Sequence, residues 1–102
     1  MPQLESRTVV LYDIRHDRTR FKVSEKCLDF GLARFQYSAF YGSLTRNRRE
    51  ELALSLEHLI EIHGGAIAIF PLCATDCQNW INVYIEPPPT ELPALKLMTG
   101  DT

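Results

Sequence analysis

The sequence predicts an α+β domain of the ferredoxin-like βαββαβ type with an extra C-terminal strand. The order of its segments carries this prediction, because β-branched and aromatic stretches alternate with two stretches that have apolar residues at helical spacing. The 102 residues also match the size of one domain, and 45% of them are apolar, as in globular proteins. We expect the domain to span residues 1–86, including the extra strand, and a Pro-rich tail to follow over residues 87–102.

The first predicted strand covers residues 7–14, which are rich in β-branched and aromatic side chains. A strand that is apolar on both faces belongs in the middle of a sheet. Alternation divides its side chains between two faces, with Val9, Leu11 and Asp13 on one and Val10, Tyr12 and Ile14 on the other. Asp13 therefore lies at the carboxyl end of a buried strand, just before a polar turn.

The first helix is predicted to run from an Asp17 N-cap to about Phe30, with Gly31 as its C-cap. Its apolar residues are expected to form one broad apolar face: Phe21, Val23, Cys27, Leu28 and Phe30.

Residues 33–44 are strand-like again and form either one bent strand or two short strands broken near Ser38 or Gly42. Thr45 or Asn47 can cap a second helix. Gly64-Gly65 is expected to end this second helix. A buried strand over Ala66–Leu72 follows, and then a fifth strand candidate over Trp80–Ile85, which the run Pro87-Pro88-Pro89 ends.

In this plan both helices cover one face of the sheet and leave the other face open. Val9 and Leu11 make the open face too apolar to remain in contact with water. The simplest partner for such a face is a second copy of the chain, related by two-fold symmetry.

The charge is distributed unevenly along the chain. Residues 7–49 hold ten Lys and Arg against four acids, a net +6, whereas residues 50–102 hold one Lys against eight acids, a net −7. A basic half of this kind can bind phosphates although the whole protein is slightly acidic. A solvated surface of mixed charge is the alternative.

Three cysteines, an odd number, argue against a disulfide scaffold. We find no signal peptide and no apolar stretch long enough to cross a bilayer, so we expect a cytoplasmic protein with reduced thiols and no membrane partner. Cys73 and Cys77 have a spacing that zinc sites can use, but a second pair is missing, which favours ordinary buried thiols.

Asp13 is the first candidate for chemistry. A carboxylate at a strand end can bind a hard cation such as Mg²⁺, which prefers oxygen ligands. An Asp in this position also commonly caps the following turn, and the residues alone leave both roles open. A two-fold dimer with facing sheets would bring two copies of Asp13 together and make a metal site more plausible.

Basic side chains gather at the two predicted helix starts. Cations there oppose the helix dipole, which is easier to explain if a phosphate binds at the same place. Ordinary ion pairs with Asp17 and Glu25 are the alternative, and His16 is a further candidate for a base or a phosphate contact. The two groups are Arg15, Arg18, Arg20 and Lys22 at the first helix, and Arg46, Arg48 and Arg49 at the second.

Three segments carry a resemblance to a known family: Val10-Leu11-Tyr12-Asp13-Ile14, the stretch 31–45 with Arg34-Phe35-Gln36-Tyr37-Ser38-Ala39-Phe40 at its centre, and Ile69-Phe70-Pro71-Leu72-Cys73. Their order, their spacing and the chain length together resemble CRISPR-associated protein two, the small subunit of the CRISPR spacer-acquisition machinery. The resemblance covers about residues 8–77.

The resemblance implies a ferredoxin-like fold, a homodimer with facing sheets, and an edge strand near residues 80–85 that docks on the partner subunit. It also implies a metal-dependent endonuclease acting on RNA or double-stranded DNA, with Asp13 as the catalytic residue and the ligand of Mg²⁺ (or Mn²⁺). The family positions linked to activity correspond to Arg20, Lys22, Arg34 and Phe40. If the chain is a nuclease, we expect His16 or Tyr12 to lie near the phosphate, with Tyr12 in a supporting role. Lys22 stands where Arg often occurs in the family.

The resemblance implies a scaffold role as well, in which the dimer bridges two dimers of the CRISPR integrase in a heterohexamer and holds the DNA that becomes a spacer. We favour this role, because metal-dependent phosphodiester cleavage usually needs two ions held by several carboxylates. Basic residues can follow a duplex backbone without reading its sequence, and the candidates are Arg18, Arg20, Lys22, Arg34, Arg46, Arg48 and Arg49.

Two alternatives remain open. The first is a Mg²⁺-dependent endoribonuclease or endodeoxyribonuclease, for which single-stranded RNA is a second candidate substrate. The other is a ferredoxin-like domain that senses a small ligand, and the excess of Arg in residues 7–49 counts against it.

Overall fold

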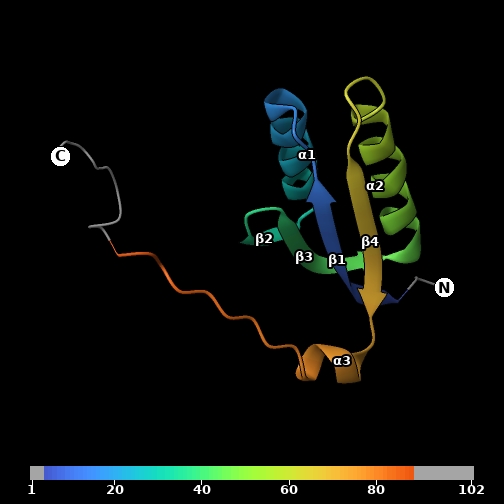
Figure 1. The fold of residues 1–102 in the computed structure, drawn as a ribbon. Coiled ribbons are helices and arrows are strands. Elements are labelled where there is room, and N and C mark those ends of the chain that lie inside the picture. Colours follow the sequence, from blue (N-terminus) through green and yellow to red (C-terminus); the bar gives the residue numbers. More distant parts are fainter. Residues whose placement is uncertain (1–3, 89–102) are drawn as a thin grey trace.

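The computed structural model describes residues 4–88, in which helices pack against a four-stranded sheet (Figure 1). The elements in chain order are β1 (Glu5–Asp13), α1 (Asp17–Asp29), β2 (Ala33–Gln36), β3 (Ala39–Thr45), α2 (Arg46–Leu59), β4 (Ala66–Leu72) and α3 (Ala74–Gln78). Within these described residues, no helix is long and apolar enough to span a bilayer.

β1 is the central strand of the sheet. The strand order is β2-β3-β1-β4, and every neighbouring pair is antiparallel. Val9 of β1 lies opposite Tyr41 of β3 on one side and opposite Phe70 of β4 on the other. These findings confirm the predicted α+β class, the antiparallel sheet and the central position of the first strand.

One hydrophobic core fills the space between the sheet and the two long helices. Its members are Val10, Tyr12, Ile14, Val23, Cys27, Leu32, Phe40, Leu44, Leu52 and Leu56. The predicted helix-facing side of β1 is therefore confirmed. Burying one side chain of this size contributes about 1.5–3 kcal/mol, so the sheet and both helices depend on this cluster.

The apolar stripe of α1 is narrower than predicted. Val23 and Cys27 are fully buried, but Phe21 and Leu28 are largely exposed. The predicted apolar face is therefore only partly buried, because only one side of a 13-residue helix reaches the sheet and α2.

The helix caps differ from the prediction at α1 and agree with it at α2. His16, not Asp17, is the N-cap of α1, because its backbone is extended and its Nδ1 atom accepts the Thr19 N–H at 3.2 Å. Asp17 becomes the first helical residue. At α2 the cap is Thr45, one of the two predicted candidates, whose Oγ1 accepts the Arg48 N–H at 3.2 Å.

The α1 helix ends with Phe30 as its C-cap, one residue before the predicted cap. Gly31 follows with φ of 85°, a left-handed conformation that suits glycine. The next segment forms two strands, β2 and β3, as in the second predicted alternative. The break falls at Tyr37-Ser38, and the pairing of the two strands shifts between Arg34 and Gln36.

The predicted C-terminal strand over residues 80–85 is not seen. After β4 the chain forms the short helix α3, and the following segment leads away from the sheet without strand pairing (Figure 1). A strand needs a hydrogen-bonded neighbour strand, and within residues 4–88 this segment contacts the sheet through side chains: the Trp80 ring packs against Phe35 and Tyr41, and Gln36 Nε2 donates to Asn82 Oδ1 at 2.9 Å. Of the predicted tail over residues 87–102, residues 89–102 lie outside the described part of the chain.

The close approach of β3 to the end of α1 yields a stability prediction. A Cβ atom at Gly42 would lie 2.7 Å from Leu32 Cδ2 and 3.2 Å from Leu32 Cα. We expect Gly42→Ala to lower the free energy of unfolding by about 1–3 kcal/mol, as overpacking does. Urea unfolding measures this loss. The neighbouring Ser43→Ala, at an exposed position, is the control and should stay within about 0.5 kcal/mol of the wild type. Equal losses in the two variants would contradict the packing argument.

Candidate nucleic-acid interface and the Asp13 strand end

Asp13 is the last residue of β1, and it is exposed. Its backbone lies opposite Ala66, the first residue of β4. Residues 4–88 contain no group of three or more His, Cys, Asp or Glu side chains placed to bind a metal ion. Because Mg²⁺ is usually bound by one or two carboxylates together with substrate phosphates, Asp13 of a single chain is a minimal ligand set.

Tyr12 and Asp13 point to opposite faces of the sheet. The Tyr12 ring belongs to the core, stacked 6.3 Å from the Phe40 ring, whereas Asp13 is exposed. Burial raises the pKa of the Tyr12 hydroxyl, and the positive charge and hydrogen bond of Arg34 partly offset this increase. Tyr12 is thus placed to interact with Arg34 and not to assist Asp13 directly.

Arg20 holds the turn that follows Asp13. Its Nη1 donates to the backbone oxygen of Ile14 at 2.9 Å and to that of Arg15 at 3.4 Å. Its Nη2 donates to Oδ1 of Asp17 at 2.6 Å. Because a guanidinium has five N–H donors, only those that remain are available to a phosphate.

Arg34 supports the neighbouring hairpin in a similar way. Its guanidinium lies 4.8 Å from the centroid of the Phe40 ring, and its Nη1 donates to the backbone oxygen of Tyr37. Tyr12, Arg20 and Arg34 line a common cavity of about 200 Å³, together with Tyr37. The structure thus brings three of the predicted site residues together. Tyr37 was not among them, because its role depends on the position of the turn between β2 and β3.

The two predicted basic groups lie at opposite ends of β1. One group, within residues 18–22, is on α1, which begins just after Asp13 ends the strand. The other, within residues 46–49, begins α2 directly after Thr45, and Thr45 lies opposite Glu5 at the start of β1. In a single chain the groups are therefore separate surfaces.

Arg18 and Lys22 are exposed on α1, and neither has an acidic partner among residues 4–88. Arg46 and Arg48 at α2 differ, since they pair with Glu50 at 3.2 Å and with Glu51 at 2.9 Å. Exposed pairs of this kind contribute about 0–1 kcal/mol, so a phosphate can compete for them.

Arg49, the third basic residue at the start of α2, is more enclosed than Arg46 and Arg48. One guanidinium nitrogen of Arg49 is buried, with no hydrogen-bond partner in the described part of the chain.

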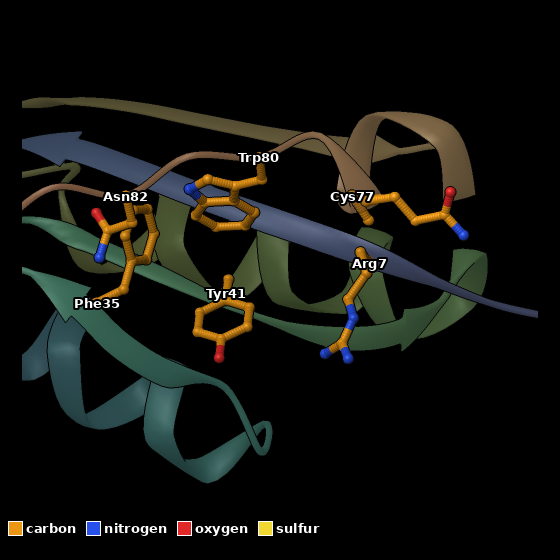
Figure 2. Close-up of a pocket in the computed structure, with 7 residues that line it drawn as sticks. Arg7, Phe35, Tyr41, Cys77, Trp80 and Asn82 are labelled. Carbon is orange, nitrogen blue, oxygen red and sulfur yellow. The ribbon is translucent and has the colours of Figure 1, made fainter.

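An aromatic cavity on the open face of the sheet was missed by the sequence analysis. Phe35, Tyr41 and Trp80 meet edge to face, with the Trp80 ring 4.8 Å from that of Phe35 and 5.3 Å from that of Tyr41 (Figure 2). The cavity has a volume of about 430 Å³, and Arg7 lies on its wall with its guanidinium 5.8 Å from the centre of the Tyr41 ring. The alternation of side chains along β2 and β3 could have placed Phe35 and Tyr41 on this face, but the position of Trp80 depends on α3.

The three cysteines occupy different environments. Cys27 is buried in the core, and this burial raises the pKa of its thiol to about 12. Cys73 is the N-cap of α3, where its Sγ lies 3.1 Å from Oδ2 of Asp76. Cys77 lines the aromatic cavity. Cys73 thus has a structural role that its spacing from Cys77 does not indicate.

Comparisons with known proteins agree with this architecture. The family model described as CRISPR associated protein Cas2 matches residues 6–80. A CRISPR-associated endoribonuclease Cas2 from Desulforudis audaxviator is 47% identical over 72 residues, which are 71% of this chain and 68% of that protein. A CRISPR-associated endonuclease Cas1/endonuclease Cas2 fusion from Thermoproteus tenax is 32% identical over 85 residues, which are 83% of this chain and 32% of the fusion.

Solved structures show the same fold. A hypothetical protein from Thermus thermophilus superimposes with a TM-score of 0.67 at 25% identity, covering 83% of this chain and 96% of that one. A crystal structure of cas2 gives a TM-score of 0.64 at 18% identity, covering 90% of this chain and 99% of that one, and supports the fold alone. Because the family model matches residues 6–80, well over half of the 102 residues, this chain belongs to the Cas2 family of CRISPR-associated proteins.

Proposed function

We propose that the protein is a CRISPR adaptation subunit whose dimer binds duplex DNA without sequence preference and bridges two dimers of the integrase. The observation that carries this proposal is the distribution of charge: basic groups lie at both ends of β1, whereas Asp13, at one end, belongs to no group of three or more possible metal ligands among residues 4–88. Such an arrangement suits contacts along a phosphate backbone better than hydrolysis. The natural fusion of Cas1 and Cas2 in Thermoproteus tenax supports Cas1 as the integrase partner.

The open face of the sheet is the proposed dimer interface. Leu11 is 41% exposed and Phe70 of the adjacent strand is 37% exposed, so apolar area remains for a partner. Val9, which was expected to add to this area, is only 5% exposed in the single chain. In a dimer, residues 80–85 would find the neighbouring strand that one chain does not supply, and two copies of Asp13 would approach each other.

The second candidate function is metal-dependent cleavage of RNA or DNA, and the endoribonuclease names of the relatives favour it. In a dimer, the two Asp13 carboxylates would hold Mg²⁺ or Mn²⁺, and the cation would activate a water molecule and neutralise phosphate charge. Arg20 would keep the turn after Asp13 in place through its bonds to the Ile14 and Arg15 carbonyls.

The residues proposed to contact phosphates are Arg18, Arg20, Lys22, Arg34, Arg46, Arg48 and Arg49, with Tyr12 and Phe40 supporting Arg34. Their contributions differ. Arg18 and Lys22 offer the whole side-chain charge to DNA, whereas Arg20 and Arg34 offer only the donors not used by the protein.

The dimer is tested by placing a charge on its proposed interface. We expect the wild type to be a dimer by light scattering at micromolar concentration, and Leu11→Glu to be a folded monomer, because a buried unpaired carboxylate is costly. Leu54→Glu, at a 69% exposed site on α2, is the control and should leave the dimer intact. A monomeric wild type would refute the interface and the paired Asp13 site together.

Nonspecific phosphate contacts are tested by the salt dependence of duplex binding. We expect Arg18→Gln to reduce the slope of log K against log salt by about 0.9, the value for one lost phosphate contact. Arg20→Gln should reduce the slope and also lower the unfolding temperature, because it removes the bonds that hold the turn. Lys26→Gln makes the same charge change in the last turn of α1 and should leave the slope unchanged. If Lys26→Gln behaves like Arg18→Gln, only net charge matters and the proposed contacts are wrong.

Asp13→Asn separates the two candidate functions, because it keeps the side-chain shape and removes the charge that would bind a cation. We expect this variant to bind DNA and to support spacer integration with its integrase, and to show no Mg²⁺-dependent cleavage. Asp29→Asn, which removes the same charge at the far end of α1, is the control. An Asp13→Asn dimer that binds DNA and integrase normally but integrates no spacers would make Asp13 chemistry the main function.

A further inference from the structure

All three histidines of the chain line one cavity near the Asp13 end of the sheet. The cavity has a volume of about 270 Å³ and lies between the start of α1 and the loop that joins α2 to β4. The titratable and charged side chains that face it are His16 from the turn after β1, Arg18 and Lys22 from α1, His58 from α2, and Glu61 and His63 from the loop.

Two of these histidines are in direct contact. The His16 and His63 rings stack with their centroids 3.5 Å apart and their planes 5° apart. His16 belongs to the turn that follows Asp13, and His63 belongs to the loop that precedes Ala66, the pairing partner of Asp13. The stack therefore connects the two loops that flank Asp13.

His16 also caps α1, and this role requires a neutral ring. Its Nδ1 accepts the Thr19 N–H at 3.2 Å and lies 2.8 Å from Oγ1 of Thr19. An imidazole nitrogen accepts a hydrogen bond only when it carries no proton, so the network assigns the ring hydrogen to Nε2. A protonated Nδ1 can still donate to Oγ1, but it can no longer accept from the Thr19 amide, and the cap is lost.

The surrounding charges also oppose protonation of the stacked rings. A cation at a helix N-terminus opposes the helix dipole. Two imidazolium rings at a centroid separation of 3.5 Å repel each other, and Arg18 and Lys22 add positive charge along the same cavity. Glu61, the one acid in the lining, lies 3.4 Å from Nδ1 of His58 and does not pair with the stacked rings.

We propose that the His16–His63 stack is a proton-sensitive latch. With both rings neutral it holds together the two loops beside Asp13, and acidification protonates the pair and releases them. Because the cap and the stack both need neutral rings, this stabilisation is present while the rings carry no proton and is lost when acidification protonates them. The inference goes beyond the proposed function and does not depend on it, because it concerns the protein without DNA.

The decisive variant is His16→Asn, because Asn caps helices well but does not titrate. His58→Asn is the matched control, since His58 lines the same cavity with a side chain that is 80% exposed and not stacked on another ring. Thermal unfolding of the full chain is measured at one protein concentration between about pH 8 and pH 5.5, a range in which histidines titrate and most carboxylates do not. We expect the unfolding temperature of the wild type to fall by about 4 °C or more over this range.

The two variants should then differ. Between the two pH values, the unfolding temperature of His58→Asn should fall by as much as that of the wild type. The unfolding temperature of His16→Asn should fall by less than half as much. Equal pH-dependent losses in His16→Asn and the wild type overturn the latch. If His16→Asn does not fold at the higher pH, His63→Gln replaces it, because this variant removes the stack and leaves the cap residue in place. The unfolding temperature of His63→Gln should also fall by less than that of the wild type, and an equal fall overturns the proposal.

A local measurement distinguishes the latch from a general effect of pH. In NMR titrations of the wild type, the ring signals of His16 and His63 should move together, and the Thr19 amide signal should move with them. The His58 ring should follow its own curve. A Thr19 amide signal that stays constant while the His16 ring titrates would mean that protonation does not break the cap, and the proposal would fail.

Discussion

β1 is hydrogen-bonded on both sides, to β3 and to β4, and this two-sided pairing determines where the chemistry of the chain lies. The middle of the strand is committed to the core through Val10 and Tyr12. Its exposed polar end is Asp13, and both long helices begin close to one end of the strand or the other. The candidate functional groups are therefore collected at the strand ends, where backbone and side chains are not required for packing.

The parts of the fold that follow from local chemistry could be predicted from the sequence. Alternation in residues 7–14 correctly assigned Val10, Tyr12 and Ile14 to the helix-facing side and Asp13 to the strand end. The exact N-cap of α1 could not be predicted from the sequence, because the side chains of Asp17 and His16 are both able to accept a backbone N–H. The choice depends on how the turn leaves β1, and in the structure Asp17 pairs with Arg20 instead. The strand predicted over residues 80–85 is not seen for another reason, since no strand among residues 4–88 pairs with this segment.

The candidate site shows a further limit of sequence reasoning. Composition located the basic residues, but it could not distinguish Arg18 from Arg20, which lie two positions apart on the same helix. The partners that engage Arg20 are mainly backbone carbonyls, of Ile14 and Arg15, and no side-chain pattern reveals a backbone partner. For the same reason, the sequence did not identify Tyr37 as a site residue, since it is the backbone carbonyl of Tyr37 that accepts from Arg34.

The aromatic cavity on the sheet gives the chain a built-in optical probe. Trp80 is its one tryptophan, and the indole is enclosed by Phe35 and Tyr41 at the base of the segment that follows α3. Excitation of the indole alone thus reports on the environment of this one position. When the segment separates from β2 and β3, the indole enters water and its emission moves to longer wavelength. When another surface covers the cavity, the emission moves in the opposite direction, so rearrangements of this face can be followed in real time without a label.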